Sequence, residues 1–260
     1  MGVTKRSFLK MLSSVAAGPI VAPVSKMLAK GTLTNWSGNI IYSTDHLEHA
    51  ASVDDVKKVI HSQQKMKALG TRHCFNTIAD SRDCLLTFER MQEMSLDTKA
   101  RTVTVGPGVK YGQLGPYLDA KGYALHNLAS LPHISVAGAC STATHGSGEH
   151  NGNLASAVSA IELVTASGDL VKLSRSSGGD FHAAVVGLGA LGVITRVSLD
   201  VQPTFQVRQY VYQDLPLRQM QEHFDEIQAA GYSVSLFTDW RAKKVSELWI
   251  KSRVGGGGMD

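Results

Sequence analysis

Apolar residues recur along this chain at two different spacings, and the change from one to the other predicts a protein of mixed helices and strands. After Ser52, a residue type that caps helix N-termini, Val56, Val59 and Ile60 recur at helical spacing. A short apolar run then follows at residues 65–69, too brief for a helix and typical of a buried strand. The first segment therefore predicts a helix that begins after Ser52 and leads into a strand.

The same alternation continues to about residue 200. Each further element is predicted from its apolar pattern and from the glycine and proline residues beside it. The predicted elements are strands at 85–88 and 102–105, a helix at 111–120, a hairpin of 160–166 with 170–173 around Ser167-Gly168-Asp169, a helix at 180–186 and a strand at 194–199.

A second unit is predicted after Pro203. It comprises a strand at 205–213, a helix at 216–230 and a strand at 232–238. Its tail, Gly255-Gly256-Gly257-Gly258, is typical of a linker and completes no element, so we expect this unit to be truncated.

Composition is that of a globular protein, with 43% hydrophobic and 18% charged residues in 260, enough for one or two domains. The net charge of +4 is mild, and part of it comes from Lys5, Arg6 and Lys10 at the N-terminus. Basic and aromatic residues do not interleave, so no nucleic-acid partner is expected.

The first 30 residues have the pattern of an export signal. A basic segment, Thr4 to Lys10, precedes an uncharged stretch from Met11 to Ser25 that Pro19 and Pro23 interrupt. It is similar to a twin-arginine signal in which lysine replaces the first arginine, so an exported, periplasmic location is expected. Retention of the segment as a membrane anchor and an ordinary disordered terminus are the alternatives.

Two loops carry the candidate chemistry. The first, Gly70 to Asn76, follows a predicted strand and contains Arg72 and His73. The second runs from Asn127 to Gly148, is rich in glycine, serine and threonine, and has no acidic side chain from Ser130 onward. Such backbone leaves N–H groups open to an anion and lets it approach closely, which predicts a site for a phosphate-bearing cofactor.

These loops resemble the FAD-binding elements of the vanillyl-alcohol-oxidase type flavoproteins, whose FAD-binding domain is called PCMH-type. Asn35 to Asn39 and Tyr232 to Trp240 are similar to the alditol (xylitol) oxidase subgroup, with aldonolactone oxidases next, so the resemblance covers about residues 35–252. It implies an α+β fold, with a two-subdomain FAD-binding domain at 35–203 followed by the start of an α+β substrate (cap) domain at 204–260.

The resemblance also assigns residues to the cofactor. It implies that His73 is joined covalently to the 8α-methyl carbon of the flavin, and it offers Ser130 as a substrate contact. Arg72 either steadies flavin or phosphate charge or is a solvated loop cation. The residues implied to bind FAD are Ala68, Leu69, Gly70, Thr71, Arg72, His73, Cys74, Ser130, Ser135, Gly138, Thr142, Ala143, Thr144, His145 and Ile194.

The three cysteines, Cys74, Cys84 and Cys140, are an odd number and indicate no disulfide framework. Relatives that attach flavin through a cysteine as well carry it in the loop that corresponds to Leu131 to Gly138. That loop has no cysteine here, so the resemblance implies a single attachment.

Two other patterns are set aside. Gly187 to Gly192 matches the dinucleotide pattern G-x-G-x-x-G, but here a predicted helix precedes it and a strand follows, the reverse of a Rossmann fingerprint. We interpret these glycines as a helix exit with close packing. His126, His133, His145 and His150 lack the spacing of a metal site, so no metal is expected.

By resemblance, the chain is expected to take a hydride from a polyol carbon to flavin N5, leaving an aldose, and to pass electrons to oxygen, giving hydrogen peroxide. Ala129 is small enough to let oxygen approach. No catalytic base is identified up to residue 260; relatives carry their substrate-side groups later in the chain. An aldonolactone oxidase or dehydrogenase and a noncatalytic flavin-binding remnant are the alternatives.

Overall fold

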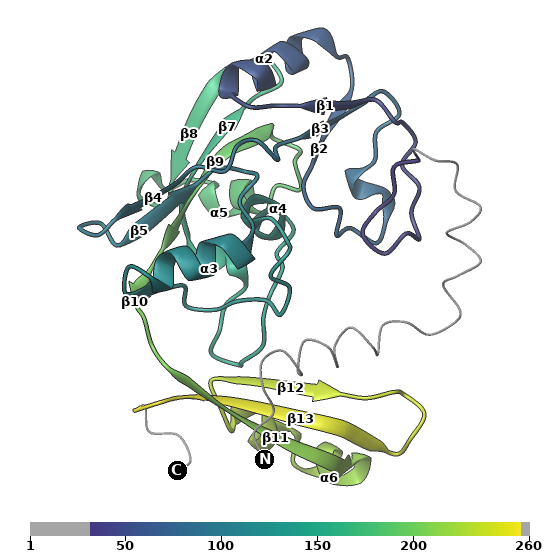
Figure 1. Cartoon of the computed structure of the whole chain (residues 1–260), viewed down its shortest axis with the longest axis vertical. Helices are drawn as coiled ribbons and strands as arrows, with labels where there is room; N and C mark the ends of the chain where they lie inside the picture. Colours follow the sequence, from purple (N-terminus) through teal and green to yellow (C-terminus); the bar gives the residue numbers. More distant parts are fainter. Residues whose placement is uncertain (1–31, 256–260) are drawn as a thin grey trace.

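The computed structural model describes residues 32–255 (Figure 1). The expected export signal at 1–30 and the glycine run beyond Gly255 lie outside this range. Within it, none of the helices has the length and apolar composition needed to cross a membrane.

The first subdomain is a small parallel sheet with one covering helix. Its strand order is β1-β3-β2. Helix α2 begins at the Ser52 hydroxyl, which accepts a hydrogen bond from the Asp55 N–H at 3.1 Å, as the capping pattern predicts. The elements are β1 (Leu47–His49), α2 (Val53–Ser62), β2 (Met66–Leu69), the 3-10 turn η1 (Thr77–Ala79) and β3 (Cys84–Thr87).

The second subdomain is a five-stranded antiparallel sheet of order β4-β5-β9-β7-β8. Its main core packs against α3, α4 and α5, and Leu114, Leu118 and Val136 are fully buried there. The elements are β4 (Met94–Asp97), β5 (Thr102–Val105), α3 (Tyr111–Asp119), β6 (Tyr123–Ala124), α4 (Val136–Ser141), η2 (Leu154–Ala157), β7 (Val158–Val164), β8 (Leu170–Ser174), η3 (Arg175–Ser177), α5 (Phe181–Val185) and β9 (Val193–Asp200).

Helix α2 joins the two subdomains. Its Val56 is fully buried in a cluster that contains Leu86 of β3 and Val164 of β7. Burying one apolar side chain against both sheets stabilises each against the other. The loops after β2 and before α4 therefore have a fixed separation.

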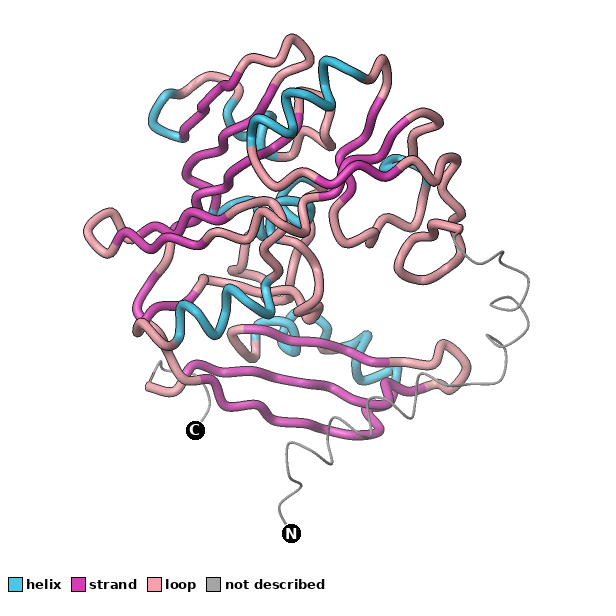
Figure 2. Tube along the Cα trace, turned by 45° about the horizontal axis from the view of Figure 1, so that its top comes forward, coloured by secondary structure: helices cyan, strands magenta, loops and turns pink. Residues whose placement is uncertain are grey.

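A third sheet follows the short strand β10 (Gln202–Pro203) and lies beside the loops of the second subdomain rather than within either subdomain (Figures 1 and 2). Its strand order is β11-β13-β12, and neighbouring strands are antiparallel. Two short helices cover one face of this sheet, where the strand residues Val234, Leu248 and Ile250 are buried. The elements are β11 (Val207–Pro216), α6 (Leu217–Glu222), α7 (Phe224–Ala229), β12 (Ser233–Phe237) and β13 (Lys244–Arg253).

Most predicted elements are confirmed within a residue or two, among them the hairpin of β7 and β8. The single helix at 216–230 was wrong: the structure has two helices that meet at His223, whose φ of −123° and ψ of 29° leave the helical region. The loop expected from Asn127 to Gly148 is also partly wrong, because Val136–Ser141 forms helix α4, whose small side chains fit against the core.

The glycine pattern at 187–192 has the predicted order, with α5 before it and β9 after it. Gly192 has a φ of +147°, and a Cβ atom there would lie 2.3 Å from the carbonyl oxygen of Val164. The close packing expected of this segment is therefore confirmed.

Replacing Gly192 with alanine should destabilise the protein by about 2 kcal/mol or more, because the backbone conformation and the contact with Val164 both exclude a side chain. Gly115→Ala is the matched control. Gly115 lies inside α3 with open space around it, so alanine there should stabilise by about 0.5 to 1 kcal/mol. Urea unfolding curves measure both, and equal midpoints for Gly192→Ala and the wild type would contradict the packing described.

Candidate functional site

The loop after β2 is held in an uncommon backbone conformation. β2 enters the core at Leu69, which is 2% exposed, and the chain turns at Gly70. Arg72 then has a φ of +63°, and its guanidinium donates to the Thr34 carbonyl at 3.0 Å. A non-glycine residue at positive φ persists only where its surroundings fix it. This bond uses only one of the guanidinium N–H groups, so both alternatives for Arg72 stay predictions.

The segment that begins α4 is clamped onto this loop. The Ser135 N–H donates to the Thr71 hydroxyl at 3.2 Å. Cβ atoms placed on Gly70 or Gly138 would each lie 2.8 Å from the Ser135 hydroxyl oxygen. Two glycines and one serine thus bring segments about 65 residues apart in sequence into direct contact.

A third segment, Asn35 to Asn39, braces the loop from the other side. Asn35 is 3% exposed, and its amide donates to the Cys74 carbonyl at 3.0 Å and to the Asn39 side chain at 2.8 Å. The Trp36 N–H also donates to the Arg72 carbonyl at 2.8 Å. This segment, noticed in the sequence only as a resemblance, therefore positions the turn that carries His73.

His73 lies in a cluster of aromatic rings. Its imidazole stacks on Trp36 with centroids 4.6 Å apart and planes 24° apart, and Phe75 meets its edge at 5.9 Å. Its Nε2 atom is in hydrogen-bond contact with Nε2 of His133. Burial first, and the neighbouring His133 second, lower the pKa of His73 below its ordinary value. The neutral, nucleophilic form of this imidazole is therefore favoured.

The loop after β2 and the segment of α4 line a hollow of about 340 Å³, within the range of small-molecule sites. Most residues that the resemblance assigned to FAD line it. They are Ala68, Leu69, Gly70, Thr71, Arg72, His73, Cys74, Ser135, Gly138, Thr142, Thr144 and Ile194.

Three assigned residues do not line this hollow. Ser130 and His145 are exposed, and the His145 Nδ1 atom lies 2.9 Å from the Gly146 carbonyl oxygen rather than facing the hollow. Ala143 has a φ of +52° at the turn that ends α4, and its neighbours Thr142 and Thr144 line the hollow instead. A substrate contact of Ser130 stays a prediction.

Sequence reasoning missed part of the wall. Pro107 lines the hollow from the turn after β5, and Leu188, Gly189 and Gly192 line it from the segment before β9. Leu188 has a φ of +51° and its N–H donates to the Ser141 carbonyl at 3.2 Å, so this segment is fastened to α4. The glycines at 187–192 were correctly separated from a Rossmann fingerprint, but their second use as cavity wall was not foreseen.

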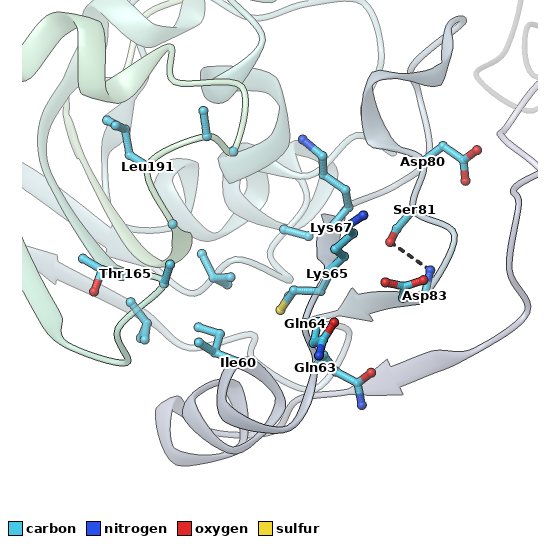
Figure 3. Close-up of a pocket in the computed structure, with 18 of the residues that line it drawn as sticks. Ile60, Gln63, Gln64, Lys65, Lys67, Asp80, Ser81, Asp83, Thr165 and Leu191 are labelled. Atoms are coloured by element: carbon cyan, nitrogen blue, oxygen red, sulfur yellow. Dashed lines mark hydrogen bonds between the residues drawn. The ribbon is translucent and has the colours of Figure 1, made fainter.

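A second hollow of about 600 Å³ meets the first, since Lys67, Ala68, Gly189 and Gly192 line both. Figure 3 shows Lys65 and Lys67 of the β2 segment between Leu191 on one side and the turn from Asp80 to Asp83 on the other. The two hollows are continuous and are lined by segments of both subdomains, so together they suit an extended ligand.

The smaller hollow suits an anion. Within residues 32–255, the backbone N–H groups of Thr71 through Cys74 donate to no protein acceptor. Its lining includes Lys67 and Arg72 but no acidic side chain. Open amides beside cations without competing carboxylates are the arrangement that a pyrophosphate requires. The residues present therefore fit FAD.

Cys74 lies next to His73 on the wall of the hollow. Burial raises the pKa of the Cys74 thiol, which disfavours the reactive thiolate next to His73. The described part of the chain also contains no group of three or more histidine, cysteine, aspartate or glutamate side chains placed to hold a metal ion.

The segment from Ser147 to Asn151 faces the third sheet rather than the hollow. The Ser147 and Ser233 hydroxyl oxygens lie 2.5 Å apart, and the Asn151 amide donates to the Tyr232 carbonyl at 2.8 Å. The Tyr232 hydroxyl donates in turn to the His126 carbonyl. The loop that contributes Thr142 and Thr144 to the hollow thus continues into the contact with the third sheet.

Asn35→Ala should lower the free energy of unfolding by about 2 kcal/mol, because it leaves the partly buried Cys74 carbonyl and Ile40 N–H without their partner. FAD affinity should fall with it, since the same bonds fix the His73 turn. Thermal melting and flavin titration measure the two effects. Asn39→Ala removes the exposed acceptor of one Asn35 bond but leaves the bonds of Asn35 to Cys74 and Ile40 in place, so it should cost about 1 kcal/mol or less. Equal losses in the two variants would contradict the bracing role of Asn35.

Comparison with known proteins yields relatives over most of the chain. An alditol oxidase from a Streptomyces species is 45% identical over 225 residues, which are 85% of this chain and 54% of the relative. An L-gulono-1,4-lactone dehydrogenase of Mycobacterium tuberculosis is 34% identical over 74% of this chain and 46% of its own. The chain spans about half the length of these relatives.

Among solved structures, cholesterol oxidase from Brevibacterium sterolicum is similar, with a TM-score of 0.75 and 18% identity over 88% of this chain and 48% of that one. At this identity the likeness shows the fold alone, and the α+β fold class expected from the sequence is confirmed. The family model described as "FAD binding domain" matches residues 45–174. The chain therefore belongs to the PCMH-type FAD-binding domain family.

Proposed function

We propose that this chain is the FAD-binding part of an oxidase that converts a polyol, such as xylitol or sorbitol, to an aldose while dioxygen is reduced to hydrogen peroxide. The observation that carries the proposal is the convergence of the Gly70 to Cys74 turn and α4 on one acid-free hollow, in a chain 45% identical to an alditol oxidase. Bound FAD supplies the acceptor for the two electrons of the alcohol.

The residues of the chain hold and orient the cofactor. The open amides of Thr71 to Cys74 suit the pyrophosphate, and Gly70 and Gly138 let it approach the backbone. Ile194 lines the hollow on the side of the second subdomain. We propose that His73 bonds covalently to the flavin, because its imidazole is kept neutral and lies on the wall of the hollow.

An aldonolactone oxidase or dehydrogenase is the second candidate function. It is favoured by relatives such as the L-gulono-1,4-lactone dehydrogenase of Mycobacterium tuberculosis and the D-arabinono-1,4-lactone oxidase of Saccharomyces cerevisiae, the latter 27% identical over 67% of this chain. A flavin-binding protein without turnover is the third candidate, since the chain spans about half the length of its relatives.

Replacing His73 with alanine should abolish covalently bound flavin, because the proposed attachment atom is removed. Cys74→Ser is the matched control: it changes the adjacent residue and should leave the flavin attached. Intact-mass spectra and fluorescence of the denatured protein measure the result. Flavin that stays bound to denatured His73→Ala protein would refute the attachment.

Substrate class is tested by peroxide release. Xylitol or sorbitol should yield peroxide at a rate at least about tenfold above L-gulono- and D-arabinono-1,4-lactone, the ratio that about 1.4 kcal/mol of differential transition-state binding gives. The opposite ranking would favour the lactone enzyme, and dye reduction without peroxide would indicate a dehydrogenase. Flavin binding without turnover of any of these would leave only the third candidate.

A further inference from the structure

The side chains of His73 and His133 form a hydrogen-bonded pair. The two imidazoles come from the β2–η1 loop and the β6–α4 loop, 60 residues apart, and meet through their Nε2 atoms. Two imidazole nitrogens in contact share one hydrogen, since one must donate and the other accept. When Nε2 of His73 carries that hydrogen, its Nδ1 atom has a free lone pair.

The surrounding structure fixes this pair. The same two loops are joined by the hydrogen bond from the Ser135 N–H to the Thr71 hydroxyl, at 3.2 Å. Thr71 lies two residues before His73, and Ser135 lies two residues after His133. The Gly112 N–H donates to the Pro132 carbonyl at 2.7 Å, which holds the chain next to His133 from the side of α3. Both imidazoles are thus positioned by hydrogen bonds of their neighbours along the chain.

The Trp36 indole aligns the two rings. It stacks on His73 with planes 24° apart and on His133 with planes 17° apart, at centroid distances of 4.6 and 5.3 Å. Asn35, next to Trp36, is the buried brace of the loop. Both imidazoles therefore lie against the same indole, with their own centroids 4.6 Å apart and their planes tilted by 41°, and this shared contact holds them together.

Few other groups at this point can take a proton. The hollow has no carboxylate in its lining, and burial keeps the adjacent Cys74 thiol protonated. The Arg72 guanidinium is bound to the Thr34 carbonyl and has no acceptor capacity. His133 is therefore the basic group in contact with His73.

We propose that His133 is the base that activates His73 for covalent attachment of the flavin, a role that rests on the proposed function. Nδ1 of His73 forms a bond to the 8α-carbon as a methyl C–H bond of the flavin breaks, and His133 takes the Nε2 proton of His73. The two electrons released pass through the flavin to dioxygen, which with two protons becomes hydrogen peroxide. The overall change is flavin-CH₃ plus imidazole N–H plus O₂ to flavin-CH₂-imidazole plus H₂O₂.

The test follows attachment rather than turnover. The full chain is produced in riboflavin-limited cells, FAD is added, and covalent flavin is followed by intact mass and by fluorescence after denaturation. His133→Leu, which keeps bulk but removes the base, should attach flavin about 100-fold more slowly while still binding FAD. His150→Leu, at a histidine whose side chain is 93% exposed, is the control and should match the wild type.

A structural role of His133 is separated from a basic one by chemical rescue. Free imidazole should accelerate attachment in His133→Ala and leave the wild type unchanged. Attachment at the wild-type rate in His133→Leu, or slow attachment in His133→Ala that imidazole does not raise, would overturn the inference. A wild-type protein that binds FAD but never attaches it would instead refute the covalent bond itself, so the two failures are distinguishable.

Discussion

The site depends on the clamp between two loops that are distant in sequence. The Thr71 hydroxyl accepts a hydrogen bond from the Ser135 N–H, and the Ser135 hydroxyl oxygen would lie 2.8 Å from a Cβ atom at either Gly70 or Gly138. Because this contact is made within the wall of the hollow, any change that separates the loops also changes the hollow. Helix α2 fixes the separation on a larger scale, by burying Val56 between the two sheets.

The turn around His73 has carbonyl groups that are hydrogen-bonded and N–H groups that are not. Asn35 holds the Cys74 carbonyl and Trp36 holds the Arg72 carbonyl, so the carbonyl groups of the turn are satisfied by a third segment. The N–H groups of Thr71 to Cys74 remain open within the described chain. Buried or half-buried donors without partners are costly in most proteins, and a bound anion is the partner that this arrangement suits.

Much of this could be read from the sequence, and the reasons for the rest are physical. Elements with a clear apolar period were found, such as α2, β5 and the hairpin of β7 with β8. Helix α4 was taken as loop because its small residues carry little periodic signal, and their burial depends on contacts with the distant core. Strand β13 was passed over although Val245, Leu248 and Ile250 are buried along it, since its pairing with β11 and β12 completes the sheet only in three dimensions.

The site itself was foreseen in outline through its two loops. The contributions of Pro107, Leu188 and Gly189 were not, because nothing local marks a turn as the wall of a cavity formed by other segments. The contact of His133 with His73 was equally invisible, since the spacing of histidines along the chain says nothing about which rings meet. A contact between side chains of two distant loops can be identified only from the folded structure.

Hydrogen exchange of the chain with and without FAD tests most directly whether the cofactor occupies the hollow between these loops. Binding should slow exchange of the Thr71 to Cys74 amides strongly, because they have no protein acceptor within residues 32–255, with weaker protection at Gly138 to Thr142. Protection confined to the third sheet, or FAD binding that leaves Thr71 to Cys74 unchanged, would contradict the assignment of the site.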